Sequence, residues 1–293
     1  MIDDGLIGLN SNAYLSENLL LMSRCALKNP CLCLILVLAL APSAWAGPYP
    51  PAAGLPGSDA LKNTDPRFVE WASGYQNYIQ GSPINKAFTD PTQTLGPAKG
   101  TIGGITELGD GGQITLTFDS PIVASPTGGP DFAVFGNSFS SGYLKLAYVE
   151  VSQDDIHWYL MPNHSLTPGP VGTYGNNMDA SNISGLAGKY VVGYGTPFRL
   201  SDVGLQWASY VRLIDVVGDG TNLDSSGNPI YDPSPNSNGF NAGGVGVLSD
   251  AATVPEPTSL SLMVLGTLLA GIAWSRRRSI GKHSSLHRAG SPN

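Results

Sequence analysis

The chain of 293 residues is acidic, with 22 Asp and Glu against 15 Lys and Arg and a net charge of −7. An acidic surface is a poor match for nucleic acid or anionic lipid, so neither is an expected partner. Charged residues make up only 13% of the chain, whereas 37 glycines and 23 prolines are typical of short strands joined by turns. The three cysteines, Cys25, Cys31 and Cys33, all lie before residue 47, so the chain beyond that point has no disulfide or thiol chemistry.

The N-terminal segment has the three parts of a secretory signal peptide. A basic region is followed by an apolar core and then by a small-x-small site at Ala44 and Ala46. This order predicts a signal peptide over residues 22–46 that is cleaved before Gly47. The residues upstream of the basic region are acidic, which is unusual for a signal peptide, so we expect Met22 to be the true start of the protein.

Residues 47–57 are rich in Pro, Ala and Gly without periodicity, and they predict a linker. One folded domain is expected over residues 58–250, because about two hundred residues suffice for a single core. The domain should open on a short helix from Asp65 to about Gly74, since Asp65-Pro66 is typical of a helix start. Aromatic residues then follow at spacings of three and four, namely Phe68, Trp71 and Tyr75.

Most of the domain is predicted to be β-structure. The expected strands are residues 113–118, 131–135, 146–152, 157–160, 190–194, 210–217 and 244–248. The first of these should end before Pro121, the third and fourth should form a hairpin, and a glycine- and asparagine-rich loop should fill residues 218–241. Many short strands with one helix predict an all-β fold, an antiparallel β-sandwich or jelly roll.

The C-terminal part contains three features in a fixed order. Val254-Pro255-Glu256-Pro257 lies in a linker, residues 251–258, which its prolines keep extended. An uncharged apolar run follows and, with the basic cluster, predicts a transmembrane helix over residues 259–278. Arg276, Arg277 and Arg278 should stay on the cytoplasmic side, because loops there collect basic residues. Residues 279–293 form a tail.

This order of features resembles the PEP-CTERM sorting signal of bacterial surface proteins. The resemblance implies export, a transient stay in the inner membrane of a Gram-negative bacterium, and processing by an exosortase, a membrane protease-transpeptidase. The protein would then reside at the cell surface or in the extracellular matrix, with exopolysaccharide as a candidate partner. The tail beyond the arginines is a modest departure from the pattern.

The domain itself resembles one that is common in exported proteins of bacteria with this sorting system. The matching segments are Pro66 to Val69, Leu108 to Gly112, Asp131 to Phe135, Leu146 to Ser152, Gly193 to Phe198, Asp219-Gly220 and Ile230 to Pro233. They extend over nearly all of residues 65–249. The resemblance implies a calcium-compatible, jelly-roll-like surface domain without a defined activity.

The chain departs from that family pattern at five positions where relatives commonly carry an acid: Gly136, Lys145, Arg199, Asn241 and Gly243. If several of these acids converge on one cation, their joint loss predicts that any structural calcium site is degraded here. A fixed Lys or Arg can offset remaining carboxylates without a bound ion. We therefore expect Lys145 or Arg199 within salt-bridge reach of a residual acid such as Asp131 or Asp215.

The candidate calcium ligands are Asp131, Asp215, Asp219, Asp224 and Asp232. The loop from Asp215 to Asn228 has the oxygen-rich spacing that calcium uses, but it is not an EF-hand, because no Glu closes a twelve-residue loop. Asp and Asn in such turns also bond to their own backbone, so the sequence leaves both interpretations open.

The sequence favours a non-enzymatic role. His157 and His164 are the only histidines between residues 47 and 275, and no nucleophile elbow, zinc-spaced cluster or phosphate loop accompanies them. Asp154 and Asp155 could serve acid–base chemistry, yet adjacent acids are common in hairpin turns. A hydrolase is therefore the third hypothesis, after a surface protein and a carbohydrate-binding module.

A carbohydrate-binding module on the same anchor is the alternative function. Its stacking platform could come from Tyr143, Tyr148, Trp158, Tyr159, Tyr174, Tyr190, Tyr194, Trp207 and Tyr210. Most of these residues fall on predicted strands, where large rings usually fill the core or pair across strands. Two coplanar exposed rings on one face would favour this alternative, and burial of the rings would exclude it.

Overall fold

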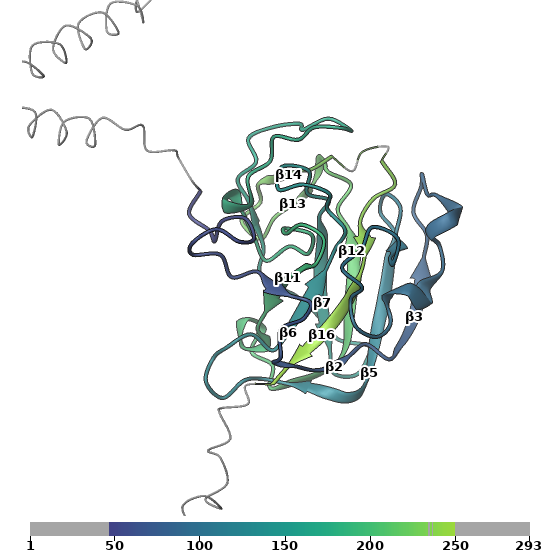
Figure 1. Ribbon diagram of the computed structural model, residues 1–293, viewed down its shortest axis with the longest axis vertical. Coiled ribbons are helices and arrows are strands. Elements are labelled where there is room, and N and C mark those ends of the chain that lie inside the picture. Colours follow the sequence, from purple (N-terminus) through teal and green to yellow (C-terminus); the bar gives the residue numbers. More distant parts are fainter. Residues whose placement is uncertain (1–46, 234, 236, 250–293) are drawn as a thin grey trace, which may run out of the picture. The chain divides into compact units, whose positions relative to one another are not determined.

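The computed structural model describes residues 47–233, 235 and 237–249 (Figure 1). The predicted signal peptide, Pro-Glu-Pro motif, transmembrane helix, basic cluster and tail lie outside these residues. Among the described residues, we find no helix with the length and apolar character needed to cross a bilayer.

Two five-stranded antiparallel sheets form the body of the domain. The first has the order β1 (Leu61–Lys62), β11 (Tyr194–Phe198), β6 (Phe132–Phe135), β16 (Gly244–Leu248) and β2 (Phe68–Trp71). The second has the order β3 (Gly74–Ile79), β5 (Gln113–Val123), β12 (Trp207–Asp215), β7 (Ala147–Ser152) and β8 (Trp158–Leu160).

Short elements connect and cap these sheets. Three two-stranded pairs are formed by β4 (Thr106–Glu107) with β15 (Asn241–Ala242), β9 (His164–Ser165) with β10 (Ile183–Ser184), and β13 (Asp219–Leu223) with β14 (Pro229–Tyr231). The helical turns of the described residues are all 3-10 turns: η1 (Lys86–Phe88), η2 (Pro91–Thr94), η3 (Ala180–Asn182) and η4 (Leu200–Val203).

The two sheets pack face to face because buried apolar residues alternate along their strands. Val211 and Leu213 of β12 and Val149 and Val151 of β7 are buried on the inner side of the second sheet. They share one core cluster with Phe132, Val134, Val245 and Val247 of the first sheet. The predicted all-β antiparallel sandwich is therefore confirmed.

The predicted helix from Asp65 to Gly74 is wrong, because this segment forms β2 and the start of β3. β2 pairs with β16, which places Trp71 opposite Gly246. The rings of Phe68 and Trp71 pack on Phe135, with centroids 5.6 and 5.3 Å from its centroid. Pairing satisfies backbone groups of β16 and buries the rings, and these tertiary gains outweigh the helical spacing of the aromatic residues.

Three other predicted boundaries need correction. β5 continues through Pro121 to Val123, and its pairing with β12 shifts between Ala208 and Tyr210. A proline is tolerated at such an irregularity because the ladder is interrupted there. The strand predicted over residues 190–194 begins only at Tyr194 and runs to Phe198. The predicted loop over residues 218–241 contains the β13–β14 hairpin, because its turn residues also suit a hairpin.

The segment predicted as a linker, residues 47–57, is part of the domain. The N–H of Gly47 donates to the Ser181 hydroxyl at 2.7 Å, and the N–H of Tyr49 donates to the Ser181 carbonyl at 3.0 Å. Ala52 and Ala53 pack against a second buried cluster. Composition alone missed this docking, because small residues and prolines serve in close packing as well as in free linkers.

Replacing Phe135 by Ala tests the packing of β2 on the first sheet. Phe135 is fully buried beneath Phe68 and Trp71, so the variant should lose about 3–5 kcal/mol of unfolding free energy. The matched control is Val69→Ala, at an exposed position of β2, which should change stability by less than about 0.5 kcal/mol. Equal effects in equilibrium urea unfolding would contradict the observed packing.

Candidate functional site

A cleft of about 430 Å³ opens at the end of the sandwich where β6 and β12 finish and where β16 and β7 begin. The strand register brings these ends together, since Phe135 pairs with Gly244 and Asp215 pairs with Ala147. β4 and β15 pair with each other and contribute Glu107 and Asn241 to the cleft. The cleft is thus built from segments far apart in sequence, which the two sheets position.

Four buried polar side chains form the floor of the cleft: Glu107, Asn137, Lys145 and Asn241. Asn137 is 5% exposed and Asn241 is 7% exposed. The amide nitrogen of Asn137 donates to the Ile102 carbonyl at 2.9 Å, which fixes the orientation of its Oδ1. Neither Oδ1 atom has a hydrogen-bond partner among the described residues. Because a buried acceptor without a partner is costly, each of these atoms is available to accept a hydrogen bond from water or from a ligand in the cleft.

Aromatic rings form the rim of the cleft. Phe139 and Tyr143 stack with their centroids 5.9 Å apart and their planes 18° apart. Phe139 is 56% exposed and Tyr174, from a later loop, is 87% exposed. Clustered exposed rings beside a polar floor are typical of a ligand surface. Sequence reasoning omitted Phe139, although a large ring within the turn-rich segment 138–142 is a signal of exposure.

Lys145 lies in the field of several acids. Its ammonium group donates a hydrogen bond to the Ser237 carbonyl. Burial lowers the pKa of Lys145, while the negative charges of Glu107, Asp232, Asp215 and Asp110 oppose that shift. We call Lys145 and these four acids the buried charge cluster. Two of its members, Glu107 and Lys145, line the cleft.

Two acids of the buried charge cluster have raised pKa values. Burial raises the pKa of Glu107, and the hydrogen bond that its carboxylate accepts from the Asn85 N–H partly offsets this effect. Burial and the charge of Asp232 raise the pKa of Asp215 well above the usual range of an aspartate. Because four carboxyl groups surround one ammonium group, the floor has a negative potential once the acids ionise.

The five positions without the acids expected from the family pattern do not all lie together. Lys145 and Asn241 line the cleft, and Gly136 and Gly243 lie beside it in a smaller cavity. Arg199 instead lines a separate cavity of about 100 Å³. A Cβ atom at Gly136 would lie 3.1 Å from the Phe240 ring, so an acid there requires that the ring move.

The candidate calcium ligands already accept hydrogen bonds from the chain. Asp131 accepts from the N–H groups of Ser125 and Leu200, both at 2.6 Å, and Asp224 accepts from the N–H of Ser165 at 2.9 Å. Asp219 accepts from Thr221, Asp232 from the Leu146 N–H at 2.7 Å, and Asp215 from the N–H groups of Gly111 and Phe240. Within the described part of the chain, no three His, Cys, Asp or Glu side chains are grouped to hold a metal. Calcium binding and its loss both stay predictions.

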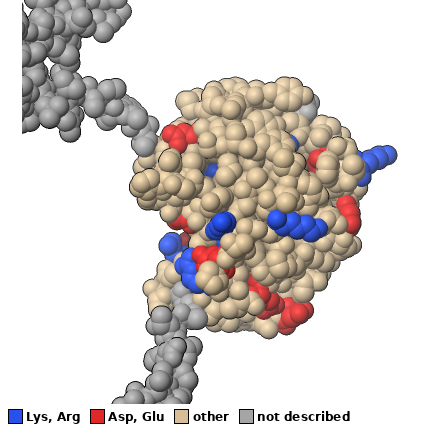
Figure 2. Space-filling model, in the orientation of Figure 1, with Lys and Arg blue, Asp and Glu red and all other residues tan. Residues whose placement is uncertain are grey.

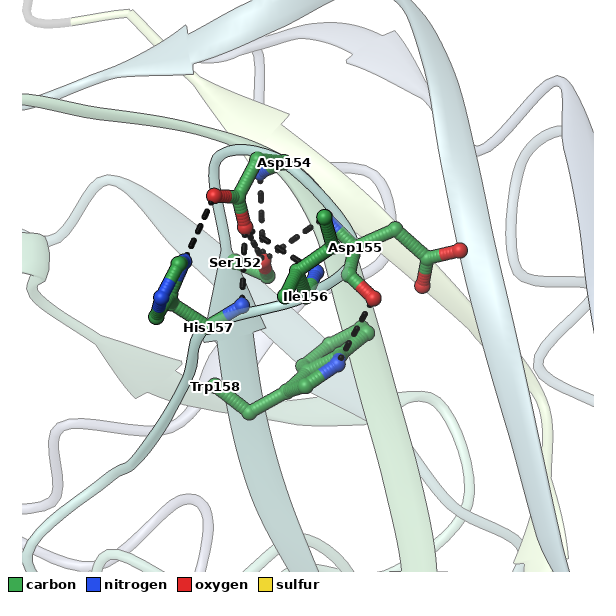
Figure 3. Close-up of polar contacts among 6 residues, drawn as sticks. All are labelled: Ser152, Asp154, Asp155, Ile156, His157 and Trp158. Atoms are coloured by element: carbon green, nitrogen blue, oxygen red, sulfur yellow. Dashed lines mark hydrogen bonds and ion pairs between the residues drawn. The ribbon is translucent and has the colours of Figure 1, made fainter.

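The turn that contains Asp154 and Asp155 has a structural role. Asp154 accepts hydrogen bonds from the N–H groups of Ile156 and His157, and its other oxygen lies 2.7 Å from His157 Nδ1 (Figure 3). These bonds hold the pKa of Asp154 far below its usual range. The Ser152 hydroxyl accepts from the N–H groups of residues 154 and 155, so Ser152 caps the turn and is not aligned with the histidine as a nucleophile.

His164 is also explained by packing. Its ring stacks on Tyr49 with centroids 5.9 Å apart, and its Nδ1 lies 3.1 Å from the Ser226 hydroxyl. Neither histidine lines the cleft. The two histidines thus have structural roles, one in a turn and one in surface packing.

The aromatic residues singled out from the sequence have different environments. Tyr190 is buried, and Trp158 is half-buried with the Arg212 guanidinium 3.9 Å from its ring centroid. Tyr159 and Trp207 are exposed but lie outside the cleft. Tyr143 and Tyr174 line the cleft together with Phe139. Burial therefore excludes Tyr190 from the predicted platform, and the rings that line the cleft are the exposed Phe139 and Tyr174 and the half-buried Tyr143.

Comparison with known families identifies the C-terminal segment. Residues 253–278 match the PEP-CTERM protein-sorting motif. This match confirms the resemblance seen in Val254-Pro255-Glu256-Pro257, the apolar run and the three arginines. It indicates an exported protein with a C-terminal, membrane-anchoring sorting signal. No curated protein matches the chain.

Solved structures similar to the chain include three carbohydrate-binding modules. A pectin-binding module in a monoclinic crystal form is 12% identical, with a TM-score of 0.30, and the alignment covers 62% of this chain and 93% of that one. CpGH89CBM32-4, produced by Clostridium perfringens, is 9% identical with a TM-score of 0.28 over 64% of this chain and 99% of that one. GH31 CBM32-2 bound to GalNAc is 8% identical with a TM-score of 0.29, and the alignment covers 61% of this chain and 99% of that one. A likeness at this level does not identify a ligand.

Replacing Lys145 by Met tests the electrostatics of the buried charge cluster. Without the ammonium group, the carboxyl pKa values in the cluster should rise further. An acid whose pKa is raised by folding stabilises the fold below its unfolded pKa and loses that contribution as pH rises through its folded pKa. The variant's loss of unfolding free energy should therefore grow between pH 5 and pH 8, by about 1.4 kcal/mol for each unit of additional rise.

The matched control for this experiment is Lys86→Met, at an exposed position. Its effect on stability should be nearly constant over the same pH range. Urea unfolding of the two variants and the parent protein at several pH values makes the comparison. A Lys145→Met effect that does not change with pH would show that the acids do not sense this ammonium group.

Proposed function

Because residues 253–278 carry the PEP-CTERM protein-sorting motif, we propose that this chain is an exported surface protein sorted by an exosortase. In this proposal the apolar run from residue 259 holds the protein in the inner membrane, and the arginines keep its end on the cytoplasmic side. The folded domain is then delivered to the cell surface or extracellular matrix of a Gram-negative bacterium. Residues 251–258 supply the extended segment that a processing enzyme needs.

The contacts of Gly47 suit a signal peptide that is cleaved before this residue. The N–H of Gly47 donates to the Ser181 hydroxyl, which holds the residue against the domain. A side chain at position 47 would overlap the carbonyl of Ser181, so the close approach requires glycine. We propose that residues 22–46 are the signal peptide and that residues 47–249 are the exported domain.

The role that best fits the geometry of this domain is carbohydrate binding in the cleft. The observation that carries the proposal is the stacked pair of the exposed Phe139 and the half-buried Tyr143, beside the buried, unpartnered oxygens of Asn137 and Asn241. A sugar ring presents apolar C–H faces and polar hydroxyl edges, so it matches rings and hydrogen-bonding groups placed side by side. Charged side chains are sparse on much of the face in Figure 2, which suits an uncharged, polar partner.

The cleft is less suited to hydrolysis. Most glycoside hydrolases flank the scissile bond with two carboxyl groups. Among the described residues that line the cleft, Glu107 supplies the one carboxyl group, and Lys145 lies in the same floor. A binding role therefore accounts for the cleft with fewer assumptions than an enzyme, and we propose that the domain is non-enzymatic.

Replacing Arg276, Arg277 and Arg278 with Gln tests the sorting proposal. Without the basic cluster, the C-terminal end of the predicted transmembrane helix no longer prefers the cytoplasmic side. Retention in the membrane and C-terminal processing should therefore fall. Immunoblots of membrane, surface and medium fractions measure the amounts of the unprocessed chain and of the chain whose C-terminal signal has been removed. The control changes three polar tail residues, Ser284, Ser285 and His287, and should be processed normally. Normal processing of the arginine variant would contradict the proposal.

Replacing Phe139 by Ala tests carbohydrate binding. We expect soluble polysaccharides in a native gel to retard the full chain, in a polyoxyethylene detergent without sugar groups, and we expect the variant to lose most of that retardation. Tyr159→Ala removes an exposed ring outside the cleft and should migrate like the parent protein. Equal retardation of the parent and both variants would place any binding outside the cleft.

A further inference from the structure

We infer that the cleft selects uncharged glycans over acidic ones, because its floor offers hydrogen-bond acceptors within an excess of negative charge. This inference rests on the proposed carbohydrate-binding function and adds the chemical class of the ligand. It follows from the direction of hydrogen bonding at the floor, from the charges around Lys145 and from the character of the rim.

The groups at the floor that lack partners are acceptors. The Oδ1 atoms of Asn137 and Asn241 accept hydrogen bonds and have no partner among the described residues. The orientation of Asn137 is set by the bond from its amide nitrogen to Ile102, so the oxygen is the free end. Glu107 adds a carboxylate, which is also an acceptor when ionised. A sugar hydroxyl can donate to each of these groups, whereas the carboxylate of an acidic sugar offers only further acceptors at the place where it binds.

The charges at the floor disfavour an acidic ligand. Glu107 lines the cleft, and Asp110, Asp215 and Asp232 lie close enough to Lys145 to act on its pKa. From residue 47 to residue 275 the chain has 19 Asp and Glu against 8 Lys and Arg, so the wider surface has the same sign. Like charges brought together in a partly desolvated site repel strongly, because the effective dielectric there is lower than in water.

Lys145 could in principle attract a carboxylate, but it is already engaged. Its ammonium group donates to the Ser237 carbonyl, and the side chain is buried. Four acids outnumber this cation, so once they are ionised a ligand carboxylate meets the field of the whole cluster rather than of the ammonium alone. Lys145 therefore offsets the charge of the protein's own acids and leaves little positive potential for a ligand.

The rim of the cleft also favours an uncharged ligand over an acidic one. Phe139 and Tyr143 present aromatic faces, whose quadrupole is negative, and an aromatic face attracts C–H groups and repels anions. Phe88, Ile102 and Ile105 add apolar surface to the lining. The C–H face of a neutral pyranose fits such a rim without loss of charge solvation, whereas the carboxylate of a uronic acid would lose water there.

Affinity electrophoresis with two classes of polysaccharide tests this inference. The neutral probes are soluble galactomannan and dextran, and the acidic probes are polygalacturonate and alginate. The full chain is run in the same sugar-free detergent, and mobility against polymer concentration gives an apparent Kd for each probe. We expect retardation by at least one neutral probe, with binding to the acidic probes weaker by at least about tenfold, since about 1.4 kcal/mol of repulsion suffices for that difference.

A charge-removing variant shows whether the cluster causes the selection. Glu107→Gln removes a negative charge from the floor while it keeps an acceptor, so the difference between neutral and acidic probes should shrink at least threefold. The matched control is Glu70→Gln, on β2, which pairs with the far end of β16 and should leave the ratio unchanged. Thermal unfolding of both variants shows that they remain folded.

The outcomes separate the two levels of the proposal. The inference is supported if the neutral polysaccharides bind, the acidic ones bind more weakly, and Glu107→Gln reduces this difference in apparent Kd. Acidic polymers bound as tightly as neutral ones, with loss of binding in Phe139→Ala, would overturn the inference and leave carbohydrate binding in the cleft intact. Binding to none of the four probes would overturn both.

Discussion

The buried carboxylate of Asp215 is the interaction on which the cleft depends. It ends β12 and accepts hydrogen bonds from the N–H of Gly111 and the N–H of Phe240, which belong to two loops distant in sequence. Asp232 performs a similar task by accepting from the N–H of Leu146 at the start of β7. These carboxylates fix loop backbones whose own ladders have ended, so the floor of the cleft is formed before any ligand arrives.

Burying several acids at one end of a sandwich is costly, and the protein offsets part of that cost locally. Backbone N–H groups bind the carboxylates, and Lys145 supplies one positive charge among them. When the four acids are ionised, a single ammonium group does not balance their charge. The cleft therefore has a negative potential. The carboxyl groups that hold the loops together thereby also determine which class of ligand the cleft accepts.

Much of the fold could be predicted from the sequence, because alternating residues such as those of β5, β7 and β12 identify sheet strands that are buried on one face. The helix at residues 65–74 could not be rejected in this way. Phe68 and Trp71 have helical spacing, and only their contact with Phe135, more than sixty positions further along the chain, selects the strand. The sorting motif could be identified from the sequence alone, because its three parts follow one another along the chain.

The cleft was largely hidden from sequence reasoning. Lys145 stood out through its charge and Tyr143 and Tyr174 through their rings, yet nothing local indicated that they share a site with Glu107, Asn137 and Asn241. That proximity arises from strand register, which joins the end of β6 to the start of β16. The sequence offers these acids as candidate calcium ligands or as turn caps, and the structure shows them bonded to backbone N–H groups, a role that spacing cannot distinguish from metal binding.

NMR titration of the isotopically labelled chain with a neutral oligosaccharide shows whether the cleft holds an uncharged glycan. The side-chain amide signals of Asn137 and Asn241 and the ring signals of Phe139 report on the floor and rim separately. We predict saturable shifts of these signals, while those of Trp207 and His157 remain in place. Saturable shifts confined to residues outside the cleft, or none at millimolar ligand, would contradict the account.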